Sequence, residues 1–170
     1  MATIDFEFKK SIVGSEIGNT LSYCYQCATC SGACPVAQVT EGRYNPRRLI
    51  LDALLGLKEK IFGEEHSFDI WGCTVCDTCD EVCPQKVELT EIFTLLKNES
   101  VKRGEAPEHY TMQASMILES GLAIPLQSAI ERRRDQFDLP EVMTPDVDEV
   151  KKLLEATKLA DKLPKKEKEN

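Results

Sequence analysis

The sequence predicts a mainly α-helical protein built around two cysteine-rich loops. All eight cysteines of the 170-residue chain fall in two runs of identical spacing, and the second run begins 49 residues after the first. Apolar residues recur every three or four positions after each run, which is the spacing of one face of a helix. Prolines precede and glycines follow several of these stretches, as is typical of helix starts and stops. The expected order is therefore loop, helix, loop, helix, followed by further helices.

The residues before the first cysteine run have a different pattern. Ile4, Phe6 and Phe8 alternate with acidic residues, so the first eight residues predict a short strand with these three side chains on one face. A loop is expected from Gly14 to Asn19.

Two helices are expected in the core, one after each cysteine run. Asn45 resembles an N-cap before a proline at the first helical position, so a helix is expected from Pro46 to about Phe62, with Gly63 as its stop. A second helix is expected from Leu89 to Lys102, just before Gly104. Its buried face is expected to hold Leu89, Ile92, Phe93 and Leu96.

Three more helices without cysteines are expected after the core. They should run from Pro107 towards Gly121, from Pro125 to about Asp135, and through the amphipathic stretch from Val147 to Leu154. We therefore divide the chain into three parts. Residues 1–104 form the core with both cysteine runs, 105–163 form a helical extension that packs on the core or on a partner, and 164–170 form a disordered tail.

The composition argues against several classes of protein. With 21 basic and 29 acidic residues the chain has a net charge of −8, so a nucleic-acid backbone or an anionic membrane surface would repel it. No apolar segment approaches the roughly 20 residues needed to span a bilayer. Asp5 and Glu7 interrupt the apolar residues near Met1, unlike a signal peptide. We expect a cytoplasmic protein with no nucleic-acid partner and no membrane span. The triplet Arg132–Arg134 could dock an acidic partner or form a solvated helix face.

Both cysteine runs spell C-x2-C-x2-C-x3-C-P. The first consists of Cys24, Cys27, Cys30 and Cys34 before Pro35, and the second of Cys73, Cys76, Cys79 and Cys83 before Pro84. This spacing lets three thiolates of one loop each reach a different iron of a cubane, so we expect two [4Fe-4S] clusters with all eight cysteines as ligands. Two four-cysteine zinc sites or a set of disulfides are the alternatives. Zinc sites usually show separated C-x2-4-C pairs, and a reducing cytosol keeps thiols free.

The fourth cysteine of each run need not serve its own loop. In two-cluster ferredoxins with this spacing, the fourth cysteine ligates the other cluster. By this analogy, cluster 1 is held by Cys24, Cys27, Cys30 and Cys83, and cluster 2 by Cys73, Cys76, Cys79 and Cys34. The second run also contains Asp77, Asp80 and Glu81. Negative charge disfavours an added electron, so we hypothesise that cluster 2 has the lower reduction potential, unless these carboxylates face water and are screened.

The spacing of the two runs resembles a known fold. The 38 residues between Cys34 and Cys73, with a helix after each run, resemble the alpha-helical ferredoxin fold of iron-sulfur subunits in succinate dehydrogenase, glycolate oxidase and heterodisulfide reductase. The motifs that carry a closer resemblance, to the C subunit of heterodisulfide reductase from methanogenic archaea, are Tyr23-Cys24-Tyr25-Gln26-Cys27, Asn45-Pro46-Arg47 and Trp71-Gly72-Cys73.

The resemblance implies an electron relay. In that family, the C subunit carries electrons from a flavin-containing A subunit to the B subunit, whose cysteine-rich CCG domains reduce the mixed disulfide of coenzyme M and coenzyme B during methanogenesis. A hydrogenase or formate dehydrogenase would be an indirect partner. No two cysteines are adjacent in this chain, and it has no G-x-G-x-x-G or P-loop motif, so we expect an oxidoreductase subunit without a substrate site of its own.

Two cysteine runs are also compatible with other functions. The chain could be the relay subunit of a succinate, fumarate, glycolate or lactate oxidoreductase, although the extra cysteine-rich domains usual in those proteins are absent here. An iron-sulfur sensor or assembly protein would need an output surface such as a basic recognition helix, which the acidic charge disfavours. Iron and labile sulfide content would distinguish a zinc-stabilised interaction module.

Overall fold

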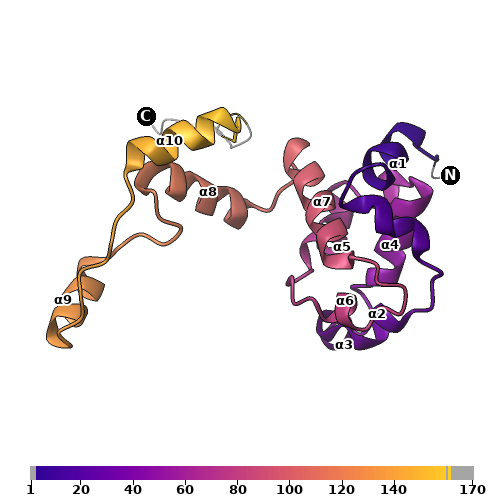
Figure 1. Ribbon diagram of the computed structural model, residues 1–170, viewed down its shortest axis with the longest axis horizontal. Coiled ribbons are helices and arrows are strands. Elements are labelled where there is room, and N and C mark those ends of the chain that lie inside the picture. Colours follow the sequence, from indigo (N-terminus) through magenta and orange to yellow (C-terminus); the bar gives the residue numbers. More distant parts are fainter. Residues whose placement is uncertain (1–2, 160, 162–170) are drawn as a thin grey trace. The chain divides into compact units, whose positions relative to one another are not determined.

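The computed structural model describes residues 3–159 and 161 of the chain, and the regular structure there consists of helices (Figure 1). This confirms the prediction of a mainly α-helical fold. With η for 3-10 helices, the elements are α1 (Phe6–Val13), η1 (Gly18–Tyr23), α2 (Thr29–Ala33), α3 (Pro35–Val39), α4 (Pro46–Leu55), η2 (Lys58–Lys60), η3 (Glu64–His66), α5 (Ser67–Trp71), α6 (Thr78–Glu81), α7 (Leu89–Lys102), α8 (Glu108–Ser120), α9 (Ser128–Gln136) and α10 (Val147–Ala156). The chain forms two compact units, one up to Ala106 and one from Pro107 onward.

The expected N-terminal strand is wrong, because these residues form α1. The Asp5 carboxylate caps the helix by accepting a hydrogen bond from the Phe8 N–H at 2.9 Å. Phe8 and Ile12, four residues apart, are buried, whereas Phe6 is 73% exposed. An alternation of three apolar residues is too short to separate a strand from a helix. Here the two buried residues, Phe8 and Ile12, have the i, i+4 spacing of one helix face, which favours the helix.

The first core helix, α4, starts where the sequence predicts but ends earlier. Asn45 caps it by accepting a hydrogen bond from the Arg48 N–H at 3.2 Å. Gly56 adopts φ = 74° at its C-terminus, and the Leu57 N–H closes the cap on the carbonyl of Asp52 at 2.8 Å. The helix therefore stops at Leu55 rather than near Phe62, and Gly63 is not its terminator.

The remaining expected helices are present. Helix α7 has the predicted bounds, and its four predicted core residues are buried. Helices α8 and α10 confirm the predictions for residues 107–121 and 147–154, and Gly121 ends α8 with φ = 73°. Helix α9 begins at Ser128, three residues later than expected. The predicted disordered tail, 164–170, lies outside the described residues.

A main hydrophobic core holds the first unit together, and Cys34, Ala37 and Tyr44 form a second, smaller cluster. The main core combines side chains from α1, α4 and α7 with residues of the intervening segments: Phe8, Ile12, Leu21, Leu49, Ile50, Ala53, Ile61, Phe62, Ile70, Cys79, Val87, Leu89, Ile92, Phe93 and Leu96. Four further cysteines pack against this core, so the cysteine loops are part of it.

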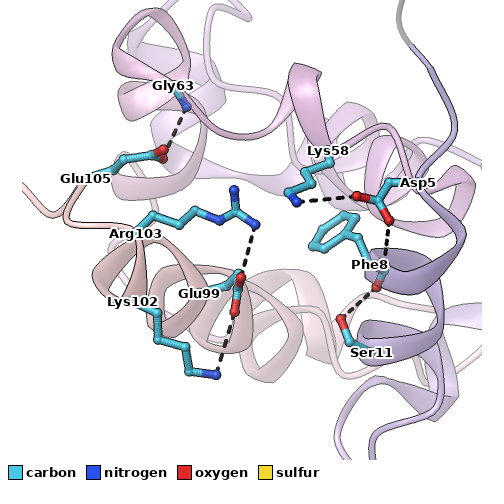
Figure 2. Close-up of polar contacts among 9 residues, drawn as sticks. All are labelled: Asp5, Phe8, Ser11, Lys58, Gly63, Glu99, Lys102, Arg103 and Glu105. Atoms are coloured by element: carbon cyan, nitrogen blue, oxygen red, sulfur yellow. Dashed lines mark hydrogen bonds and ion pairs between the residues drawn. The ribbon is translucent and has the colours of Figure 1, made fainter.

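Polar contacts close one side of the first unit (Figure 2). Lys58 pairs with Asp5 at 3.3 Å, and the Glu105 carboxylate accepts a hydrogen bond from the Gly63 N–H at 3.2 Å. Arg103 donates to Glu99 at 3.0 Å, and its guanidinium lies 4.2 Å from the centroid of the Phe62 ring. These contacts fix the start of α1 and the end of α7 to the segment that follows α4.

The second unit consists of α8, α9 and α10 within the described residues. Helices α8 and α10 pack against each other. None of the described residues from Pro107 onward is buried, and apolar side chains such as Ile124, Phe137 and Met143 are 74%, 70% and 91% exposed. Arg134 closes the turn after α9 by donating to the Pro140 carbonyl at 2.7 Å.

None of the helices among residues 3–159 and 161 combines the length and apolar character that crossing a bilayer would require.

Candidate functional site

Two hollows in the first unit bring the eight cysteines together in sets that mix the two runs. The first hollow is lined by Cys24, Cys27 and Cys30 together with Cys83. The second hollow is lined by Cys73, Cys76 and Cys79 together with Cys34. All eight cysteines are free of disulfides, which argues against the disulfide alternative.

The two cysteine loops have the same backbone conformation. Gln26 and Ala28 have φ of 64° and 70° in the first loop, and Val75 and Asp77 have φ of 54° and 58° at the equivalent places in the second. Left-handed conformations next to right-handed ones turn successive N–H groups into a concavity that suits anions, as in many Fe–S sites. Neither loop uses glycine at these positions. The strained backbone of a β-branched residue such as Val75 therefore marks a functional constraint.

Short helices hold these loops in place. Helix α2 follows the first loop, α6 follows the second, and the two pack against each other. The Ser31 hydroxyl of α2 donates to the Asn45 side-chain oxygen at 2.8 Å and accepts the Arg47 N–H at 3.1 Å. This ties the first loop to the N-terminus of α4.

The second loop is tied to α7. The Asp80 carboxylate accepts the Thr90 N–H at 3.1 Å, which caps the first turn of α7. Lys97 of α7 donates to the Cys73 carbonyl at 2.9 Å. Just before this loop, the Trp71 indole donates to the buried Ser100 hydroxyl at 3.2 Å.

Several cysteine sulfurs receive hydrogen bonds from the backbone. The Ala37, Val75 and Val87 N–H groups donate to the sulfurs of Cys34, Cys73 and Cys83 at 3.5, 3.4 and 3.3 Å. Such bonds favour an added electron on a cluster that these cysteines bind.

The cysteines of each loop differ in exposure and in pKa. Cys27 and Cys76 are exposed, and the hydroxyls of Thr29 and Thr78, 3.2 and 3.4 Å from their sulfurs, lower the pKa of these two thiols.

The third cysteine of each run has a raised pKa instead of a lowered one. Burial raises the pKa of Cys30, and it raises the pKa of Cys79 to about 12. Metal binding must therefore displace a tightly held proton from these inner cysteines.

A buried hydroxyl without a partner faces the second set of cysteines. Tyr44 lines the second hollow, is 1% exposed, and its hydroxyl has no hydrogen-bond partner within the described chain. Burial raises the pKa of Tyr44 above its ordinary value, and the neighbouring side chain of Cys73 adds to the shift. A buried polar group normally has a partner. Four thiols around each hollow, N–H groups on their sulfurs and this hydroxyl fit a sulfur-rich, negatively charged cofactor such as an iron-sulfur cluster.

Sequence reasoning missed three groups beside the hollows. Tyr44 and Lys97 are far from the cysteines in the sequence, and no local pattern marks them. Arg47 did give a signal, because a cation near a helix N-terminus is unfavourable. Both Arg47 and its neighbour Arg48 are exposed; Arg47 lines the first hollow and donates to the Gln26 carbonyl at 3.4 Å, and Arg48 pairs with Asp52 at 3.7 Å.

The acidic residues of the second run differ in their surroundings. Asp77 and Glu81 are exposed, so water and salt screen their charges. Asp80 is partly buried, and one of its oxygens lies 3.8 Å from the Cys79 sulfur. Of these three carboxylates, Asp80 is therefore the one placed to act strongly on a cluster in the second hollow.

Among residues 3–159 and 161, no group of three or more His, Cys, Asp and Glu side chains is arranged to hold a single metal ion.

Comparison with known proteins identifies the kind of site. Residues 20–87, which contain both hollows' cysteines, match the 4Fe-4S dicluster domain family. The chain is 35% identical over 163 residues to the second iron-sulfur C subunit of CoB–CoM heterodisulfide reductase from Methanocaldococcus jannaschii, covering 92% of this chain and 84% of the relative. It is 35% identical over 161 residues to the C subunit of the H(2):CoB-CoM heterodisulfide,ferredoxin reductase of Methanothermobacter thermautotrophicus, covering 91% and 83%. It is 30% identical over 155 residues to the C subunit of the ferredoxin/F(420)H(2)-dependent CoB-CoM heterodisulfide reductase of Methanosarcina acetivorans, covering 88% and 92%.

Proposed function

This chain belongs to the family of heterodisulfide reductase C subunits, which are iron-sulfur proteins, and from this premise we propose that it relays electrons between a flavin-containing A subunit and a CCG-domain B subunit. The observation that carries the proposal is the arrangement of the two hollows. They share the first turn of α7, where Leu89 lines the first hollow and the next residue, Thr90, lines the second. Cofactors in hollows this close can exchange electrons.

We propose two [4Fe-4S] clusters with crossed ligands. Cluster 1 is held by Cys24, Cys27, Cys30 and Cys83, and cluster 2 by Cys73, Cys76, Cys79 and Cys34. The mixed sets of cysteines around the two hollows support this assignment. When bound, each cluster takes up and gives off one electron at a time. Crossed ligation would also tie the two cysteine loops together, because each cluster then fastens a residue of the other loop.

The chain's own residues give each cluster a different contact with solvent. Cys27 and Cys76 are exposed, whereas Cys34 and Cys79 are buried. The exposed cysteines would leave a side of each cluster near the surface, where a partner's cofactor can approach. Both buried cysteines line the second hollow, so cluster 2 would be the better shielded from water.

We propose that the chain has no substrate site of its own, and that the mixed disulfide of coenzyme M and coenzyme B is reduced on the CCG-domain partner. A hydrogenase or a formate dehydrogenase would then feed the complex indirectly. Eight free cysteines also suit a reducing compartment, so we propose the cytoplasm as the location.

The helical extension, residues 105–163, is proposed to complete its packing on the core or on a partner subunit. In the described part of this extension α8 and α10 cover one another, but no side chain from Pro107 onward is buried. A unit without a buried core has too little apolar burial to offset its conformational entropy.

The relay is tested by anaerobic affinity purification of the tagged chain from its native cells, with iron and sulfide analysis and EPR of the reduced complex. We expect about eight irons per chain, as two four-iron clusters require, together with flavin-binding and CCG-domain subunits. Zinc in place of iron, or a chain that purifies alone, would refute the proposal. If dehydrogenase subunits of the succinate or glycolate type were recovered instead, the chain would be an electron relay in that complex rather than in a heterodisulfide reductase.

A further inference from the structure

The hydroxyl of Tyr44 is the most unusual polar group in the first unit. It belongs to a fully buried side chain in the wall of the second hollow, where it makes no hydrogen bond of regular geometry within the described chain and has the side chain of Cys73 as a polar neighbour. A hydroxyl buried without a well-formed hydrogen bond destabilises a folded protein. A group bound by the cysteines of this hollow would supply the missing acceptor.

The ring of Tyr44 is held firmly in this position. It packs edge-on against Phe68, with ring centroids 6.3 Å apart. A Cβ at Gly72 would lie 3.0 Å from the Tyr44 ring, so glycine at this position lets the ring lie close against the backbone next to Cys73. On the other side, the Tyr44 N–H donates to the Thr40 hydroxyl at 3.2 Å. The hydroxyl therefore has little freedom to turn towards another partner.

We propose that the Tyr44 hydroxyl donates a hydrogen bond to a sulfur of cluster 2 and raises the reduction potential of that cluster. The inference rests on the proposed ligand set, since Tyr44 lies in the same wall as Cys34 and Cys73. A donor to sulfur stabilises the reduced cluster more than the oxidised one, because reduction adds negative charge. Lys97, which bonds the Cys73 carbonyl, acts in the same direction.

The first hollow has a different donor. There the Gln26 side-chain amide donates to the Cys24 sulfur at 3.4 Å, and the equivalent residue of the second loop is Val75, which has no polar side chain. Both sites also have a threonine hydroxyl beside the second cysteine of the run, so Tyr44 gives the second site a donor in place of the Gln26 amide. Removing the hydroxyl should consequently affect cluster 2 and leave cluster 1 unchanged.

Tyr44→Phe is the decisive variant, because it removes one oxygen and keeps the ring. In a potentiometric titration of the whole complex followed by EPR, we expect cluster 2 to bind its electron about tenfold more weakly, a fall of about 59 mV for one electron. Tyr23→Phe makes the same chemical change at a side chain that is 63% exposed, and it should shift neither potential. Unchanged potentials in Tyr44→Phe, or a shift of cluster 1 alone, would overturn the inference.

A second measurement covers the case in which Tyr44→Phe loses a cluster. Wild-type protein reconstituted with clusters in H2O and in D2O is compared by electron-nuclear double resonance of reduced cluster 2. The N–H groups on the sulfurs of Cys34 and Cys73 also supply exchangeable protons, so the expected result is one further exchangeable coupling, which is absent from Tyr44→Phe where that variant loads. No coupling beyond those of the N–H groups in the wild-type spectrum would exclude the hydrogen bond. If the wild type itself holds fewer than two clusters, the proposed ligand set fails rather than the role of Tyr44.

Discussion

The charge of Asp80 should lower the reduction potential of cluster 2. One oxygen of this partly buried carboxylate lies 3.8 Å from the sulfur of Cys79, a proposed ligand of cluster 2. Two unit charges at this distance interact by about 1 kcal/mol under water-like screening and by about 4 kcal/mol at an intermediate dielectric. We take the lower value, because the Thr90 N–H and the N-terminus of α7 offset part of the carboxylate charge. For one electron this corresponds to about 45 mV.

Asp80→Asn removes the charge and keeps an oxygen that can cap α7. We expect the potential of cluster 2 to rise by about 45 mV in an EPR-monitored redox titration. The unfolding midpoint should fall slightly, because the N-terminus of α7 loses a favourable negative charge. Asp77→Asn is the matched control, since Asp77 is exposed and its charge is screened, so its shift should stay below about 10 mV. Equal shifts in the two variants, or no shift in Asp80→Asn, would refute the reasoning from burial and distance.

Three further predictions concern the ligands, the loops and the extension. Cys34→Ser should alter the EPR signal of cluster 2, and Cys83→Ser that of cluster 1; the opposite pattern would show that each loop binds its own cluster. Val75→Gly should raise the free energy of anaerobic urea unfolding by about 1 kcal/mol, because Val75 is left-handed with φ = 54° and such a backbone costs an L-residue about 1–2 kcal/mol. Thr74→Gly, next to it and without a positive φ, should lower that free energy, and a gain in both variants would contradict the assignment of strain. Backbone amides of residues 107–161 should exchange more slowly with deuterium in the complex than in the free chain, and equal rates would show that no partner completes this unit.

Local signals in the sequence predicted much of the fold. The bounds of α7 followed from its apolar spacing and from Gly104, and the start of α4 followed from Asn45 and Pro46. The end of α4 was misjudged, because apolar residues continue at helical spacing beyond Gly56. What stops the helix is the left-handed conformation of that glycine, and the carbonyl of Gly56 is then free to accept the Asp5 N–H at 2.9 Å. Such a long-range contact has no signature near either residue.

The same limit applies to the candidate site. The eight cysteines were recognisable because their spacing is a local pattern, and the structure brings them around two hollows. Tertiary packing alone brings Tyr44 to the second hollow and Lys97 to the Cys73 carbonyl, so the acidity of the second run was the visible signal there. The acidity of the run gives Asp77 and Glu81 the same weight as Asp80, but these two carboxylates are exposed and their charges are screened. The structure adds Tyr44 and Lys97, which would favour an added electron on cluster 2, whereas the carboxylates would disfavour it.

The two loops show how strongly the cofactor must govern this region. Their left-handed positions are equivalent, yet they are occupied by unrelated residues, Gln26 and Ala28 in one loop and Val75 and Asp77 in the other. Each such position costs about 1–3 kcal/mol, so together they consume a large part of the roughly 5–15 kcal/mol by which a domain is usually stable. The unpartnered hydroxyl of Tyr44 adds to that cost. Metal-ligand bonds form only when the loops adopt this conformation, so their free energy can offset such costs. We therefore expect cluster binding and folding of the loops to be one coupled event, in which the ligand spacing, rather than the preferences of the residues between the ligands, sets the conformation that the loops share.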